Sequence, residues 1–273
     1  MPVAHSVRAA ALGALDAVEG ALGRGDPLRP PRRLHHVGDG DFRAVGEALL
    51  EALIAVGGLD RDARVLDVGC GTGRTAVPLT GYLRDGSYDG FDISAPAIRW
   101  CQDTLTSRFP TFVFRALDIA NSHYNPDGGL DASGIRFPYE PDAFDFAVAT
   151  SVFTHMLPGG FLHYLDELAR VLAPGGTFFG TFFLLDEDSL TALDRGRTLL
   201  ELPTRHHDAA HRVDYRAMDA RTPETGIALP AYFVLDGLGE RGFEVSAVHP
   251  GLWSGHVDGA LYQDIVVARR RLG

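Results

Sequence analysis

The chain has 273 residues and a formal net charge of −11, with 45% hydrophobic and 22% charged residues. This length and composition are typical of a globular protein with one substantial core and room for insertions. The acidic charge argues against a nucleic-acid partner, because proteins that bind nucleic acid present basic surfaces. Apolar runs fall short of the roughly 18 residues of a membrane span, and the two cysteines fit a reducing compartment. We therefore expect a cytoplasmic protein that binds neither nucleic acid nor a membrane.

The first forty residues are predicted to form a helix and an extended arm ahead of the main domain. Apolar residues recur at helical spacing over residues 5–23, and Gly23-Arg24-Gly25-Asp26-Pro27 ends this helix. The pair Pro30-Pro31 makes the following segment extended. The main domain, residues 41–273, is predicted to begin with an amphipathic helix over residues 41–57.

Beyond this helix, predicted strands and helices alternate along the chain. Such alternation implies parallel strands joined by right-handed crossovers, and therefore an α/β fold. Two stretches do not belong to the alternation, residues 121–143 and residues 186–230. Loops longer than about 15 residues in a compact domain are usually functional or disordered, so we treat both as insertions with a role of their own.

The run Val65-Leu66-Asp67-Val68-Gly69-Cys70-Gly71-Thr72-Gly73-Arg74 is the most informative segment. It is predicted to be a buried strand, a glycine turn and the start of a helix, and its glycines permit the positive φ angles of a tight turn. A turn that binds phosphate offers backbone N–H groups to the anion. The carboxylate of Asp67 would repel phosphate but suits a ligand with an ammonium group, such as S-adenosylmethionine. A nicotinamide oxidoreductase is the alternative, disfavoured by Asp67 and by GxGxG in place of GxGxxG spacing.

This run resembles the first motif of the class I S-adenosylmethionine-dependent methyltransferases, and further motifs follow in the family's order. Asp92 ends the next predicted strand, where a carboxylate can bind both ribose hydroxyls. The resemblance implies a Rossmann-like, seven-stranded, mostly parallel sheet, with a reversed hairpin from strands near 243–249 and 260–268. It also implies that Asp118 binds the adenine amino group. The predicted donor-binding residues are Asp67, Gly69, Cys70, Gly71, Gly73, Asp92, Ile93, Asp118, Ile119 and Ser151.

His155 is the predicted general base. Methyl transfer from a sulfonium is an in-line displacement, so alignment of the reactants supplies much of the rate. An aliphatic hydroxyl must also lose its proton, and a histidine with a pKa near 7 is the default group for that step. His155 follows the predicted fourth strand, at the edge where donor and acceptor meet. The alternative is that His155 packs against the adenosyl group or caps the next helix.

We predict no metal ion. Metal-assisted methyl transfer of the catechol type needs acidic residues after the fourth strand, where Thr150 and Ser151 stand. The spacing of His206, His207 and His211 is compatible with a metal site but lacks a third ligand in a defined position. The acidic run 186–188 is more simply explained as a helix N-terminus with solvated carboxylates.

The two insertions leave from the carboxyl edge of the sheet, where open α/β folds bind ligands, so we interpret them as a lid over the acceptor. Alternatively, residues 186–230 form a homodimer contact. We expect the acceptor to be a saccharide or another small molecule, because aromatic rings interleaved with carboxylates and histidines suit polyhydroxylated or ring-containing substrates. The sequence also resembles bacterial methyltransferases of sugars and secondary metabolites, the mycobacterial mannose-polysaccharide enzymes among them. Nitrogen or carbon acceptors, and a non-catalytic protein that binds the donor, stay open. The candidate acceptor residues are His123, Tyr124, Tyr139, Phe153, Tyr232 and Trp253.

Overall fold

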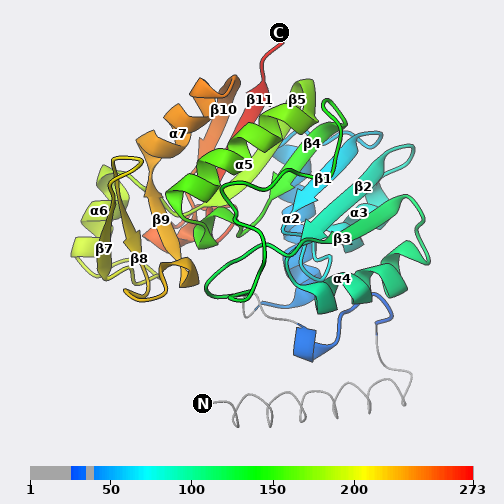
Figure 1. The fold of residues 1–273 in the computed structure, drawn as a ribbon, viewed down its shortest axis with the longest axis horizontal. Helices are drawn as coiled ribbons and strands as arrows, with labels where there is room; N and C mark the ends of the chain where they lie inside the picture. The colour runs from blue at the N-terminus through cyan, green and yellow to red at the C-terminus, as the bar shows by residue number, and fades with distance from the viewer. Residues whose placement is uncertain (1–25, 35–39, 273) are drawn as a thin grey trace.

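The computed structural model describes residues 26–34 and 40–272, so the helix predicted over residues 5–23 lies outside the described residues. A seven-stranded sheet forms the centre of the molecule, and helices cover both of its faces (Figure 1). Its strand order is β10-β11-β5-β4-β1-β2-β3, in which only β11 runs antiparallel to its neighbours. The predicted α/β class I methyltransferase fold is confirmed. The strands are β1 Arg64–Val68, β2 Ser87–Asp92, β3 Phe112–Ala116, β4 Phe144–Ala149, β5 Leu172–Phe182, β10 Phe243–His249 and β11 Asp264–Arg270.

Apolar side chains on both faces of the sheet form two cores. On β1, Val65 packs into the core beneath α2, α3 and α4, and the next residue, Leu66, packs into the core beneath α5 and α7. A parallel strand covered on both faces is apolar at nearly every position, which is why Asp67 is conspicuous in β1. None of the helices in the described part of the chain is long and apolar enough to cross a membrane. The helices on the two faces are α2 Phe42–Ala55, α3 Ala76–Tyr82, α4 Ala95–Cys101, α5 Pro158–Val171 and α7 Ala231–Glu240, and the π-helical turn η2 Gln102–Thr106 continues α4.

The two insertions have different structures. Residues 117–143 are an irregular segment between β3 and β4, with isolated bridges from Ile119 to Leu130 and from Asn121 to Asn125. The second insertion folds into a small sheet of order β6-β9-β8-β7, which lies beside the main sheet (Figure 1). Its elements are β6 Leu184–Leu185, α6 Glu187–Asp194, β7 Thr204–Asp208, β8 Val213–Ala217, η4 Pro223–Thr225 and β9 Ile227–Pro230.

The last strand begins at Asp264, four residues later than the strand predicted over 260–268. The backbone of the preceding segment instead accepts hydrogen bonds from Leu252 and Trp253, in the short helix η5 Leu252–Ser254. Asp264 is buried, and its carboxylate accepts hydrogen bonds at 2.7 Å from the amides of Leu184 and Gly251 and from Nε1 of Trp253. The carboxylate therefore ties the start of the small sheet to the main sheet.

Candidate active site

The glycine turn after β1 takes the conformation that its sequence requires. Gly69, Gly71 and Gly73 have φ angles of +71°, +53° and +74°, which residues other than glycine rarely adopt. A Cβ atom on Gly69 would lie 2.5 Å from Cγ2 of Val152, so the turn also packs directly against the segment after β4. The absence of side chains leaves the backbone of the turn open to a ligand.

Asp67 brings a carboxylate into the buried base of this turn. Its side chain is 1% exposed, and Oδ2 accepts a 2.6 Å hydrogen bond from the hydroxyl of Tyr88. Oδ1 has no hydrogen-bond partner among the described residues. Burial raises the pKa of Asp67 to about 7, with a further rise from the charge of Asp92, against smaller lowerings by the side chains of Tyr88 and Thr75. A buried oxygen without a donor fits a cationic ligand, because an ammonium group would satisfy it and favour the ionised form.

Asp92 ends β2 and faces the same turn. Its Oδ2 accepts from the amide of Gly71 and its Oδ1 from the amide of Ser94, both at 2.7 Å. Burial raises the pKa of Asp92, and these backbone donors oppose the shift. A carboxylate has about four acceptor positions, so both oxygens keep capacity for the two ribose hydroxyls. Ile93 lies next to it, partly buried against the core.

Asp118 and Ile119 follow β3 and anchor the first insertion. The exposed carboxylate of Asp118 accepts from Nδ2 of Asn125 at 3.2 Å and from the amide of Gly129 at 3.1 Å. The side chain of Ile119 is buried in the core. Asp118 therefore holds the insertion in the donor-free protein, and its predicted contact with adenine stays a prediction.

Cys70 and Ser151, two other predicted donor contacts, differ in orientation. Cys70 points into the core against Gly90, so only its backbone belongs to the turn surface, and burial raises its thiol pKa. Ser151 follows β4 with a φ of +57°, an uncommon conformation for a non-glycine residue. Its amide donates to Oγ1 of Thr181 at 2.8 Å, and its hydroxyl donates to Oε1 of Gln263 at 3.1 Å. These contacts stabilise the strained residue at the carboxyl edge of the sheet.

Three of the aromatic residues predicted to contact the acceptor make packing contacts in the structure. Phe153 is 1% exposed and stacks on Phe182, and Trp253 is 0% exposed. Tyr139 is partly buried and packs on Phe144 of β4 and Phe91 of β2, with the guanidinium of Arg115 over its ring. The sequence alone does not distinguish the two roles, because aromatic rings are as common in cores as in binding sites. Tyr232, in contrast, is 59% exposed in the first turn of α7.

His155 lies where the two insertions meet, in the short helix η3 Phe153–His155. Its Nδ1 is 2.9 Å from the backbone oxygen of Glu224 in the second insertion. From the first insertion, the ring of His123 stacks on the His155 ring at a centroid distance of 6.3 Å, and the hydroxyl of Tyr124 is 3.5 Å from Nε2. Burial lowers the pKa of His155 below its usual 6.5. Because a carbonyl oxygen only accepts, Nδ1 carries the proton and Nε2 keeps the lone pair.

The histidines of the second insertion do not converge. His207 pairs with Asp214 at 2.7 Å, whereas His206, its neighbour on β7, stacks on Tyr215. Within residues 26–34 and 40–272, no group of three or more His, Cys, Asp or Glu side chains is arranged to hold a metal ion.

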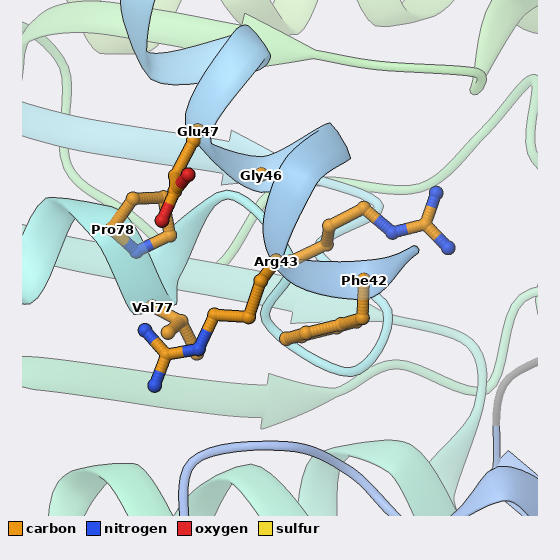
Figure 2. A pocket seen from close by; sticks show the side chains of 7 residues that line it. Phe42, Arg43, Gly46, Glu47, Val77 and Pro78 are labelled. Atoms are coloured by element: carbon orange, nitrogen blue, oxygen red, sulfur yellow. The ribbon is translucent and has the colours of Figure 1, made fainter. Parts of the chain in front are cut away.

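Two surface pockets contain none of the predicted site residues, although Arg74, directly after the glycine turn, lines the first. One of about 50 Å³ lies between α2 and α3, and Figure 2 shows Arg43 and Glu47 of α2 on one side and Val77 and Pro78 of α3 on the other. Sites for small molecules usually measure about 300–1,000 Å³, so this pocket does not accommodate a nucleoside. The other, of about 240 Å³, lies between α6 and η5.

The family model for a methyltransferase domain matches residues 40–223. The chain belongs to this family. With the sheet order and the glycine turn, the match identifies a class I S-adenosylmethionine-dependent methyltransferase, with S-adenosylmethionine as its cofactor. The two surface pockets are therefore not where we expect the donor.

Known relatives share only part of their length with this methyltransferase. It is 33% identical over 118 residues to a fatty-acid O-methyltransferase of Mycolicibacterium smegmatis, which is 43% of this chain and 36% of the relative. It is 33% identical over 113 residues to phthiotriol/phenolphthiotriol dimycocerosates methyltransferase 1 of Mycobacterium ulcerans, 41% of this chain and 35% of the relative. The matched region thus spans about a third of these curated relatives. A solved protein from Pyrococcus horikoshii shares the fold, with a TM-score of 0.55 and 19% identity over 86% of this chain and 92% of that one.

Three residues of the site are not predicted from the sequence. Tyr88 is predicted only as a strand residue, although its hydroxyl binds Asp67. Asn121 and Glu224 lie at the edges of the two insertions, and both contact His155. Polar residues in loops give no signal in a single sequence, because their partners lie about a hundred positions away in the other insertion.

Proposed function

We propose that this methyltransferase transfers a methyl group to a hydroxyl oxygen of a small molecule, with His155 as the general base. The tautomer of His155 carries the proposal: with Nδ1–H bound to the Glu224 carbonyl, the lone pair of Nε2 is available to take a proton. The lowered pKa keeps this ring neutral at pH 7. When bound, S-adenosylmethionine supplies an electrophilic methyl group on a sulfonium.

The reaction then needs one proton transfer and one displacement. The hydroxyl would pass its proton to Nε2 of His155 while its oxygen takes the methyl group that the bound donor would supply, and the donor's sulfur would keep the electrons of the broken carbon–sulfur bond. His155 afterwards releases the proton to solvent. In the donor site, Asp67 binds the ammonium group and Asp92 the ribose hydroxyls, which fixes the direction of approach. His123 and Tyr124 line the acceptor side of His155, and the two insertions form the lid.

Two classes of hydroxyl acceptor are compatible with the site. A saccharide suits the polar rings around His155, whereas the two relatives carry names that refer to a fatty acid and to phthiotriol derivatives. We therefore propose a hydroxyl acceptor and test both classes. The fold is compatible with methyl transfer to nitrogen or carbon as well, but a neutral histidine in the site favours an acceptor that must lose a proton.

A binding titration and a transfer assay test this function. We expect S-adenosylhomocysteine to bind with micromolar affinity in calorimetry and NADH not to bind. Labelled S-adenosylmethionine is then incubated with sugar, long-chain alcohol and fatty-acid acceptors. His155→Ala should lose about 10²–10⁴-fold in kcat with unchanged affinity for S-adenosylhomocysteine, while the exposed His256→Ala serves as a control. Loss of donor binding in His155→Ala would assign His155 to the adenosyl site instead of the base role.

A further inference from the structure

The two insertions are joined through one acidic side chain, that of Glu224 in η4. Its Oε1 accepts a 3.1 Å hydrogen bond from Nδ2 of Asn121. Its Oε2 accepts from the amide of Ser122 at 2.7 Å and from the hydroxyl of Ser122 at 2.5 Å. Hydrogen bonds to an ionised acceptor are among the stronger ones in proteins. We call Asn121, Ser122 and Glu224 the clasp.

The clasp is bonded to His155 from the side of the first insertion. Nδ2 of Asn121, which contacts Glu224, also donates to the backbone oxygen of His155 at 2.8 Å. Oδ1 of the same amide accepts from the backbone amides of His123 and Tyr124, at 3.0 and 2.9 Å. One side chain therefore fixes the backbone of the base and the turn that carries the two rings packed against it.

The clasp also reaches His155 from the side of the second insertion. The backbone oxygen that accepts Nδ1–H of His155 belongs to Glu224 itself. Because the Glu224 carboxylate is held by three donors, its carbonyl is held too, in the middle of the short helix η4. If the carboxylate lost these partners, η4 would lose its connection to the first insertion and the carbonyl could move away from Nδ1.

We infer that Glu224 is a positioning residue for the general base: its carboxylate joins the two insertions, and its carbonyl thereby holds His155 with the proton on Nδ1 and the lone pair on Nε2. This inference rests on the proposed function of His155. According to this inference, the clasp both holds the two insertions together and keeps the lone pair of His155 on Nε2. A ligand that separates the insertions would therefore also release the imidazole.

From the groups that face the imidazole, we can predict how the pKa of His155 changes when the clasp opens. Burial is the largest influence on the pKa of His155 and lowers it, and a charged His123 lowers it further. Glu224 and the backbone of Thr225 act in the opposite direction, and the Tyr124 hydroxyl is uncharged near neutral pH because burial raises its pKa. Opening the clasp admits water, so the dominant influence weakens and the pKa of His155 should rise toward 6.5.

Glu224→Ala tests the inference, with Glu201→Ala as the matched control, because Glu201 is exposed in the same insertion and its side chain forms no hydrogen bond or ion pair with the described residues. Nitrogen-15 NMR of the histidine rings gives the tautomer and the titration of His155. We expect the wild type and Glu201→Ala to hold the proton on Nδ1. Glu224→Ala should show a mixture of tautomers, a higher pKa and about tenfold lower kcat, with unchanged affinity for S-adenosylhomocysteine.

Glu224→Gln is the conservative variant and replaces Glu224→Ala if the latter does not fold. Glu224→Gln keeps one oxygen for Ser122 but turns an amide NH₂ toward the NH₂ of Asn121. The tautomer ratio of His155 and the kcat should therefore lie between those of the wild type and those of Glu224→Ala. Unchanged tautomer and titration in Glu224→Ala, or in Glu224→Gln if only that variant folds, would overturn the inference. The NMR readout needs no acceptor. If the wild type transfers no methyl group to any acceptor, the proposed function fails while the clasp is still tested.

Discussion

Asp67 combines two properties that a stability measurement can separate from a binding measurement. It is buried beneath the glycine turn with one oxygen unpartnered among the described residues. Burial moves its pKa from 3.8 to about 7. At about 1.4 kcal/mol for each pH unit, this difference amounts to about 4 kcal/mol of folding free energy lost when the side chain is ionised in the donor-free protein.

The substitution Asp67→Asn removes this loss and keeps an oxygen for the Tyr88 hydroxyl. The sign follows from proton binding: between pH 4 and pH 7 the folded wild type holds a proton that the unfolded chain has released, so its stability falls as the pH rises. The asparagine does not titrate. From pH 5 to pH 8 the stability of Asp67→Asn relative to wild type should therefore increase by about 2–3 kcal/mol. Any constant cost of the unpartnered amide cancels from this difference.

Urea unfolding at pH 5, 6, 7 and 8 measures this change, with the exposed Asp103→Asn as the control. The same variant should bind S-adenosylhomocysteine more weakly by about 1.5–3 kcal/mol, the contribution of a hydrogen bond to a charged group. Wild-type affinity should fall about fivefold from pH 7 to pH 6, because the ammonium group needs the ionised carboxylate, whose pKa is about 7. A stability difference that does not vary with pH would refute the raised pKa of Asp67, and an affinity that Asp67→Asn leaves unchanged would refute its assignment to the donor site.

Three further predictions concern the base, the turn and the core. The kcat of the wild type should rise with pH through a pKa below 6.5 and level off near pH 7, since burial lowers the pKa of His155; a midpoint above 7 would contradict this. Gly69→Ala places a Cβ 2.5 Å from Val152 at a φ of +71°. Thermal melts should therefore show a loss of about 1–3 kcal/mol in the free energy of unfolding, and S-adenosylhomocysteine should bind more weakly. An unaltered melting temperature would count against this close approach. Trp253→Phe removes the indole N–H that donates a hydrogen bond to buried Asp264. The folded protein should lose about 1–3 kcal/mol of stability, while its affinity for S-adenosylhomocysteine in calorimetry stays unchanged. A change in the KM of the acceptor alone would instead show that Trp253 contacts the acceptor.

Local patterns in the sequence are enough to predict the fold and where its donor site should lie. Alternating strands and helices, the glycine turn and the acidic residues that end two strands are local patterns, and backbone geometry translates them directly into a parallel sheet with a ligand at its carboxyl edge. For that reason the sequence alone is enough to predict that Asp67 and Asp92 lie together at that edge. The position of His155 after the fourth strand follows from the same geometry.

The side chains around His155 and the burial of individual aromatic residues follow from contacts between segments that are distant in the sequence. Glu224 contacts Asn121 and Ser122 across about a hundred residues of chain, and no pattern in a single sequence encodes such a pair. In the sequence, Trp253 and Phe153 look the same as aromatic residues that bind a substrate, but Trp253 is buried against Phe183 and Phe153 is buried against Phe161 and Phe182. Local periodicity fixes the elements, whereas the contacts between two insertions depend on the three-dimensional path of the chain that brings them together.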